Sequence, residues 1–185
     1  IPFDRIRAVE WLDDRIRLID QRLLPGQLRY LDLASVTEAA HAIRDMAVRG
    51  APAIGITAAY AVVLAARARF AESSGNWRTL IEPDLRMLAE ARPTAVNLRW
   101  AVERMRACIA TLAGDPVAGL LAEASRIHAE DIAANHRMGE LGAALIEPGS
   151  GVLTHCNTGA LATGGYGTAL GVVRAGFAAK RLTTV

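Results

Sequence analysis

The first part of the chain alternates between polar and apolar positions. Residues 15–18 read Arg-Ile-Arg-Leu, and this period of two is typical of a strand with one exposed face. Asp13-Asp14 and Pro25-Gly26 lie on either side of that run and are turn signals. The pattern therefore predicts a small antiparallel sheet over residues 7–33.

After this region the apolar period changes to that of helices. Ser35 and Glu38 have the spacing of a capping box, and the apolar stripe that follows predicts a helix that ends at Gly50. A second capping box, Thr79 with Glu82, is expected to open a later helix. Periodicity, prolines and glycines predict four further helices, at residues 52–75, 79–91, 95–112 and 115–146.

Two of these helices carry additional expectations. Residues 53–66 are the most apolar stretch of the chain, but a membrane span needs roughly twenty residues, so a buried core helix is predicted there. In the last helix, Gly139 and Gly142 are expected to loosen the structure, because glycine is a poor helix former.

The pattern changes again at residues 147–151, which read Glu-Pro-Gly-Ser-Gly. A strand at 151–156, a glycine-rich turn, a helix at 163–178 and a strand-like end at 181–185 predict a βαβ unit of a parallel sheet. Parallel sheets are normally covered on both faces, so this unit is expected to be only the start of a larger domain. The predicted fold class is α/β, with a small-sheet and helical domain over residues 1–146 and the first part of a doubly wound, Rossmann-like domain over residues 147–185.

Composition excludes several classes of protein. The chain has 185 residues, 52% of them hydrophobic, which is enough for one sizeable core. Its net charge is only +2 and its arginines are scattered, so neither a nucleic acid nor a membrane partner is expected. Two cysteines without metal-ligand spacing argue against a disulfide framework, and no signal peptide is visible, so a cytoplasmic location is predicted.

Cys156 is the first candidate for chemistry. It is expected at the carboxyl end of a strand and near a helix N-terminus, a place where α/β proteins bind ligands and where the pKa of a thiol falls. The alternative is a small buried apolar residue, which is the reading favoured for Cys108 because of its helical spacing. The glycines at 159–167 match neither the P-loop nor the dinucleotide fingerprint, so either close packing or an anionic ligand explains them.

Two arginines lie at predicted breaks between helices. Arg49-Gly50-Ala51-Pro52 leaves free backbone N–H groups beside a guanidinium, and Arg92-Pro93-Thr94 is a similar break. Each arginine is either a solvated surface residue or part of a phosphate site. His128 and His136 are about 12 Å apart along a helix, too far to share a metal, so surface or core placement is expected for them.

Four long segments resemble the methylthioribose-1-phosphate isomerase family, in its order and at its spacing. They read DQRLLPG, IRDMAVRGAPAIGITAAY, ARPTAVNLRWAV and THCNTGALATGGYGTALGV, and the likeness covers essentially the whole chain. The wider superfamily includes ribose-1,5-bisphosphate isomerases and regulatory subunits of a translation-initiation exchange factor. The resemblance implies a mostly helical domain joined to a Rossmann-like domain, and a homodimer.

The resemblance also implies roles for individual residues. Arg49, Gly50, Ala51 and Arg92 would contact the phosphate region of the substrate, and Cys156 would be the catalytic thiol. The second catalytic group of the family is an aspartate in a part that would lie beyond Val185, as would a substrate-binding glutamine and an Asn-Lys pair. The 185 residues alone are therefore expected to be inactive.

The implied activity is isomerisation of 5-methylthioribose 1-phosphate to 5-methylthioribulose 1-phosphate in methionine salvage. The thiol and a carboxylic acid would share the transfers, as a proton or as a hydride, with no metal or cofactor. The alternatives are a ribose 1,5-bisphosphate isomerase, and a regulatory subunit that binds a sugar phosphate or nucleotide without turnover.

Overall fold

The computed structural model describes residues 5–185, so residues 1–4 of the predicted first domain lie outside the described part. Three strands form the predicted antiparallel sheet in the order β1-β2-β3: β1 (Val9–Leu12), β2 (Arg15–Ile19) and β3 (Tyr30–Leu33). In β2, Ile16 and Leu18 are fully buried, whereas Arg15 is exposed and Arg17 is half-buried, as the period of two predicts. A short 3-10 turn, η1 (Gln21–Leu23), follows β2.

The first helix, α1 (Val36–Arg44), begins with the predicted capping box. The Ser35 hydroxyl accepts from the Glu38 N–H at 3.2 Å, and the Glu38 carboxylate accepts from the Ser35 N–H at 3.1 Å. The prediction that this helix continues to Gly50 is wrong. Met46 takes a left-handed backbone with φ 58°, and the Ala47 N–H bonds back to the Ala42 carbonyl at 2.9 Å, which closes the helix early.

The second helix, α2 (Ala51–Glu72), is the central element of the core. Every residue from Ala53 to Ala66 is buried, including Thr57, whose hydroxyl donates to the Ala53 carbonyl at 2.7 Å. By length and composition α2 could cross a membrane, but 78% of its most apolar 18-residue stretch is buried inside the protein. The prediction of a buried core helix is confirmed.

The predicted helix at 79–91 is two helices, α3 (Trp77–Leu80) and α4 (Glu82–Glu90). Thr79 lies inside α3 and its N–H bonds to the Asn76 carbonyl at 3.0 Å, so the expected capping box with Glu82 is wrong. Burial of Trp77, which is 1% exposed, anchors this extra turn against the core. The next helix, α5 (Val96–Thr111), has the predicted extent.

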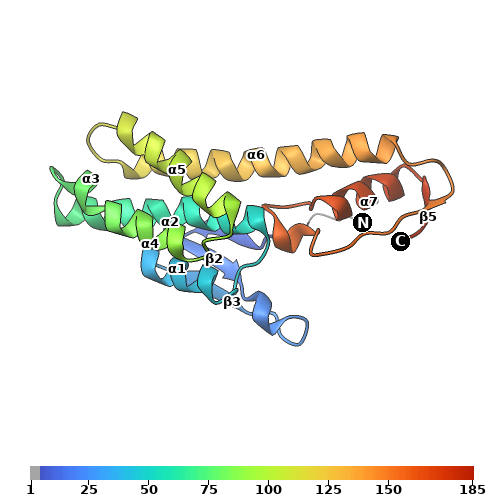
Figure 1. Cartoon of the computed structure of the whole chain (residues 1–185), viewed down its shortest axis with the longest axis horizontal. Helices are drawn as coiled ribbons and strands as arrows, with labels where there is room; N and C mark the ends of the chain where they lie inside the picture. The colour runs from blue at the N-terminus through green and yellow to red at the C-terminus, as the bar shows by residue number, and fades with distance from the viewer. Residues whose placement is uncertain (1–4) are drawn as a thin grey trace.

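The longest helix, α6 (Val117–Ala144), packs against α2 and α5 at one end and against α7 (Ala169–Ala178) at the other (Figure 1). It is continuous through Gly139 and Gly142, so the expected loosening is wrong. These glycines make room for the last part of the chain: a Cβ on Gly142 would lie 2.7 Å from Val172, and one on Gly139 would lie 2.9 Å from Tyr166.

The last part of the chain contains the predicted parallel strand pair. It consists of β4 (Ser150–Gly151), η2 (Ala160–Ala162), α7 and β5 (Leu182–Thr184). The strand predicted at 151–156 is much shorter than expected: pairing with β5 ends where the Val152 N–H bonds to the Thr184 carbonyl at 3.0 Å. The mixed α/β class is confirmed, while the domain boundary at residue 147 stays a prediction.

Candidate active site

One pocket of about 360 Å³ is lined by all five site residues predicted from the sequence: Arg49, Gly50, Ala51, Arg92 and Cys156. Its volume lies within the usual range for small-ligand sites. The five residues are contributed by the α1–α2 connection, the α4–α5 connection and the loop after β4. The full lining is Met46, Arg49, Gly50, Ala51, Ile54, Arg92, Thr94, Ala95, Cys156 and Asn157. Segments separated by more than a hundred residues of sequence therefore meet here, and we call this cavity the arginine–thiol pocket.

The α2 side of the pocket is the N-terminus of that helix. Gly50 is the N-cap residue with φ 98° and ψ 132°, a conformation that side chains disfavour, and it offers no side chain to satisfy the first N–H groups of α2. Ala51 and Ile54 of the first turn line the pocket. The partial positive charge of a helix N-terminus is thus directed toward the cavity.

In the described part of the chain several arginines pair with carboxylates, and the two arginines of the pocket are not among them. Arg17, Arg69, Arg104 and Arg106 pair with carboxylates at 2.5–3.1 Å, whereas within residues 5–185 no carboxylate pairs with Arg49 or Arg92. Arg49 is exposed and Arg92 is half-buried. Two guanidinium groups without internal counter-ions, together with a helix N-terminus, make this pocket electrostatically suited to an anion.

Cys156 is an exposed free cysteine with φ 79°, an uncommon conformation for a residue with a side chain. The expected setting for it is only partly correct. Cys156 lies five residues beyond the end of β4, and α7 begins thirteen residues after it, so it is neither at a strand end nor at the start of its own helix. The helix N-terminus that shares its pocket belongs to α2.

The glycines of the loop at residues 155–167, which we call the glycine loop, serve packing. A Cβ on Gly164 would lie 2.6 Å from His128, and one on Gly167, whose φ is 97°, would lie 2.8 Å from the Gly159 backbone. The arginine–thiol pocket is lined by Cys156 and Asn157 of this loop and by none of its glycines. Close packing therefore explains Gly164 and Gly167, and an anionic ligand for the loop stays a prediction.

A polar cluster on α6 that was not predicted from the sequence contacts this loop. His128, Asp131 and Asn135 follow one another at spacings of three and four, and all three bond to the loop around Gly164. Their helical spacing was the available signal. His128 is half-buried as part of this cluster, and His136 stacks on Tyr166 with ring centroids 3.9 Å apart.

Two further expectations concern cysteine and metals. Cys108 is half-buried on α5 and packs against the core, as its helical spacing predicts. In the part of the chain that the structure describes, no group of three or more His, Cys, Asp or Glu side chains is placed to hold a metal ion.

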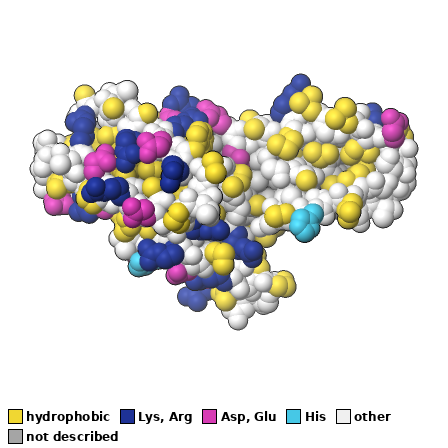
Figure 2. Space-filling model, in the orientation of Figure 1, with side chains coloured by type: hydrophobic (Ala, Val, Ile, Leu, Met, Phe, Trp, Pro, Cys, Tyr) yellow, Lys and Arg dark blue, Asp and Glu magenta, His cyan; other side chains and the backbone are white. Residues whose placement is uncertain are grey.

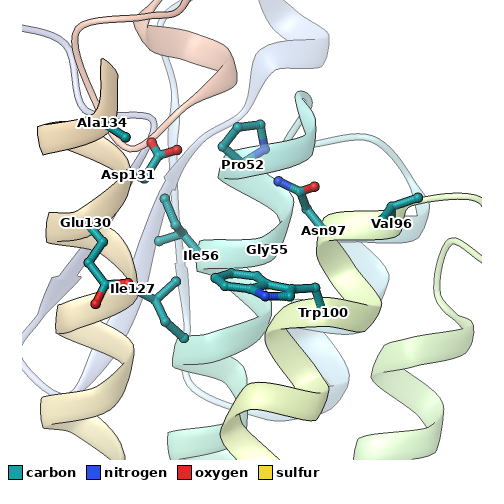
Figure 3. A pocket seen from close by; sticks show the side chains of 10 residues that line it. All are labelled: Pro52, Gly55, Ile56, Val96, Asn97, Trp100, Ile127, Glu130, Asp131 and Ala134. Atoms are coloured by element: carbon teal, nitrogen blue, oxygen red, sulfur yellow. The ribbon is translucent and has the colours of Figure 1, made fainter. Parts of the chain in front are cut away.

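A second pocket, of about 420 Å³, lies between α2, α5 and α6 (Figure 3). Its wall includes the Trp100 ring, and its acidic residues are already bound: Glu130 pairs with Arg104 at 2.6 Å, and Asp131 accepts from Gly164. No arginine or lysine lines this cavity. It therefore lacks the cationic groups that a phosphate site requires, and the arginine–thiol pocket is the better candidate.

Fold and pocket together define a class: an α/β protein whose helical part and following βαβ unit enclose a small pocket with two arginines and a thiol. The chain belongs to the initiation factor 2 subunit family, whose sequence model matches residues 47–185. This confirms the superfamily expected from the four motifs.

Individual relatives agree with this assignment. The chain is 57% identical over its whole length to the methylthioribose-1-phosphate isomerase of Thioalkalivibrio sulfidiphilus, of which it covers 53%. It is 59% identical over 98% of its length to the enzyme of the same name from Nitrosococcus oceani, again covering 53% of that protein. The chain thus spans about half the length of the curated relatives it matches, and its resemblance to that isomerase family is confirmed.

Two crystal structures have the same fold. One is 5-methylthioribose 1-phosphate isomerase from Pyrococcus horikoshii, with a TM-score of 0.88 and 37% identity over 96% of this chain and 51% of that one. The other is translation initiation factor eIF-2B, subunit delta, from A. fulgidus, with a TM-score of 0.86 and 39% identity over 97% of this chain and 54% of that one. The fold is therefore shared by proteins with an enzymatic name and by proteins with a regulatory name.

Proposed function

We propose that the whole protein carrying this chain isomerises 5-methylthioribose 1-phosphate to 5-methylthioribulose 1-phosphate, a step of methionine salvage. The observation that carries the proposal is the arginine–thiol pocket, in which Arg49, Gly50, Ala51, Arg92 and Cys156 line one cavity. Relatives at 57–59% identity that bear the name of this isomerase support the choice of substrate.

In this proposal the phosphate binds at the positive side of the pocket. Arg49 and Arg92 donate charge-assisted hydrogen bonds to its oxygens, and the backbone at Ala51 adds the N-terminal donors of α2. Because neither guanidinium has an internal counter-ion among the described residues, neither must give up an ion pair when the phosphate arrives. The sugar would then lie toward Cys156 and Asn157, which line the same pocket.

The chemistry explains why a thiol is suitable there. The phosphate occupies the anomeric oxygen, so the ring cannot open to a free aldehyde in the usual way. The ring C–O bond must break and its oxygen must gain a proton, while the C2 hydroxyl loses its proton to become the ketone and one hydrogen moves from C2 to C1, so that there is no net oxidation or reduction. Cys156 would act at these carbons as an acid–base group, and a carboxylic acid from the segment beyond Val185 would share the transfers.

The remaining partners follow from the same proposal. We expect the whole protein to be a cytoplasmic homodimer whose further segment supplies the aspartate, the glutamine and the Asn-Lys pair that the family resemblance implies. The 185 residues alone would then bind phosphate at Arg49 and Arg92 but would not turn over the sugar.

The test is turnover by the whole protein. Incubation with 5-methylthioribose 1-phosphate, followed by NMR, should show loss of the anomeric C1–H signal and appearance of the ketose. Ribose 1,5-bisphosphate is the comparison substrate, and faster turnover of it would reassign the substrate.

The second candidate, a subunit that binds without turnover, is favoured by the likeness to the eIF-2B delta subunit. Calorimetric binding of the substrate with no ketose formed would support that candidate and exclude the isomerase.

A further inference from the structure

One face of α6 contacts the glycine loop through three polar side chains. The Asp131 carboxylate accepts from the Gly164 N–H at 2.7 Å, and the His128 Nε2 lies 2.9 Å from the Gly164 carbonyl oxygen. Asn135 Nδ2 donates to the same Asp131 oxygen at 3.0 Å and lies 3.4 Å from the Gly165 carbonyl oxygen. Both backbone groups of Gly164 are thus bonded to α6.

The hydrogen-bond partners of His128 lie on both sides of its ring. A carbonyl oxygen only accepts, so Nε2 carries the proton that it donates to Gly164. On the other side, Nδ1 lies 3.2 Å from the Tyr60 hydroxyl on α2. Burial raises the pKa of Tyr60, which keeps that hydroxyl protonated and able to donate. The network therefore extends from α2 through α6 to the loop.

The loop is shaped for this contact. A Cβ on Gly164 would lie 2.6 Å from His128, 3.0 Å from Asp131 and 3.0 Å from Ile56, so only glycine lets the backbone approach α6 this closely. Figure 3 shows Asp131 extending from α6 beside the loop ribbon. Thr163, which is 1% exposed, completes the arrangement by donating to the Gly165 carbonyl at 3.0 Å.

The same loop segment is fixed on its other side by η1 and by Gly50, the residue after Arg49. Gln21 Nε2 donates to the Leu161 carbonyl at 2.7 Å, and Ala162 lies directly against Gly50. Cys156 precedes Leu161 by five residues and has no helix or strand of its own to hold it. The position of its thiol relative to the arginines thus depends on how residues 161–165 are held.

We infer that Asp131, His128 and Asn135 are positioning residues, which hold the glycine loop so that the Cys156 thiol faces Arg49 and Arg92. This inference rests on the proposed function only for its catalytic consequence. The physical claim, that Asp131 fixes the Cys156 loop through Gly164, stands on the hydrogen bonds themselves. A displacement of about 1 Å of a reacting group can reduce a rate by as much as a hundredfold.

The test compares Asp131→Ala with Asp131→Asn in the whole protein. Asparagine keeps an oxygen that can accept from the Gly164 N–H, whereas alanine removes it. We expect Asp131→Ala to lower kcat by roughly tenfold to a hundredfold with little change in KM, because the phosphate-binding arginines are untouched. Asp131→Asn should recover most of kcat.

A second readout does not depend on turnover. The rate of alkylation of Cys156 by iodoacetamide is measured by peptide mass spectrometry on folded protein, with Cys108 as the internal reference. Release of the loop should change the Cys156 rate in Asp131→Ala and leave the Cys108 rate as it is, whereas Asp131→Asn should resemble wild type. Glu140→Ala is the matched control, because Glu140 is an exposed carboxylate of α6 that pairs with Arg137 one turn earlier on the same helix.

Several outcomes would overturn the inference. Wild-type kcat and wild-type Cys156 alkylation in Asp131→Ala would do so, and so would equal impairment of the alanine and asparagine variants. If Asp131→Ala does not fold, Asn135→Ala, which removes the donor to the Gly165 carbonyl, takes its place with the same readouts. Lack of turnover by the wild-type protein would refute the proposed function alone, and the alkylation comparison would still decide the positioning role.

Discussion

Gly50 and Ala162 lie in direct backbone contact: a Cβ built on Gly50 would be 2.4 Å from the Ala162 Cα and 2.4 Å from its carbonyl oxygen. The two residues are 112 positions apart in the sequence, and Gly50 lines the arginine–thiol pocket. With its φ of 98°, Gly50 is required both by its own conformation and by this contact.

Gly50→Ala should therefore destabilise the protein and distort the pocket. A positive φ and a backbone clash together are expected to cost roughly 2–4 kcal/mol of unfolding free energy. Gly75→Ala is the matched control, because nothing lies within 4 Å of a Cβ at Gly75. Urea unfolding followed by circular dichroism measures both variants, and equal stability of the two would contradict the role given to the Gly50–Ala162 contact.

Cys156→Ala in the whole protein should abolish isomerisation while the substrate still binds, because the thiol is proposed to act on the carbons and not on the phosphate. We expect kcat to fall by at least about 10²-fold. Cys108→Ala is the control and should keep its activity, since Cys108 lies on α5 outside the arginine–thiol pocket. Near wild-type kcat in Cys156→Ala would show that this thiol takes no part in catalysis.

Arg49→Ala and Arg92→Ala should weaken phosphate binding. Loss of one charge-assisted hydrogen bond costs about 1.5–3 kcal/mol, or roughly ten- to a hundredfold in affinity. Calorimetry with inorganic phosphate is the measurement, and it applies to the 185-residue polypeptide as well as to the whole protein. Arg44→Ala and Arg86→Ala, exposed arginines outside the pocket, are the controls. Unchanged affinity in both pocket variants would show that Arg49 and Arg92 are solvated surface residues that do not bind phosphate.

Asp131 should make stability depend on pH in an unusual direction. Burial raises its pKa above the ordinary 3.8, against the lowering effects of the Gly164 N–H, His128 and Asn135. The folded state therefore holds this proton to a higher pH than the unfolded state, and stability falls as the pH rises from 3.8 through the raised pKa.

Asp131→Asn removes this titration. The unfolding free energy of the variant relative to wild type should thus increase as the pH rises from about 4 to about 7, with Glu140→Gln as the control. A difference that is constant over this range would show that the pKa of Asp131 is the same in both states.

The half of the molecule around α7 should mediate self-association of the 185-residue polypeptide. Figure 2 shows hydrophobic side chains gathered over this end, where Leu141, Leu145 and Leu153 are 53%, 84% and 96% exposed. Exposed apolar groups of this kind typically mark contact surfaces. Light scattering over a concentration series should show dimers or larger species. Leu141→Lys with Leu145→Lys should shift them toward monomer, and a monodisperse monomer before substitution would contradict the prediction.

Helix positions were the most predictable feature, because they depend on neighbours three and four residues away. The capping box at Ser35, the extents of α2 and α5 and the start of α6 all follow from such local signals. One error occurs where a distant contact overrides the local pattern, because burial of Trp77 adds a turn before α4. The early end of α1 is instead local, since Met46 takes a left-handed backbone. Among the described residues the pairing of β4 with β5 reaches only Val152, so the strand is shorter than its apolar run.

The candidate site, like the fold, could be predicted only in part from the sequence. The sequence by itself determined which residue types are available: two arginines at helix breaks, a helix start without a side-chain cap, and a cysteine in a glycine-rich loop. Only the tertiary structure decided that Arg49, Arg92 and Cys156 share one pocket and that Asp131 holds the loop. Local periodicity encodes backbone conformation over a few residues, whereas the meeting of residues a hundred positions apart is set by how α2, α5 and α6 pack around the core.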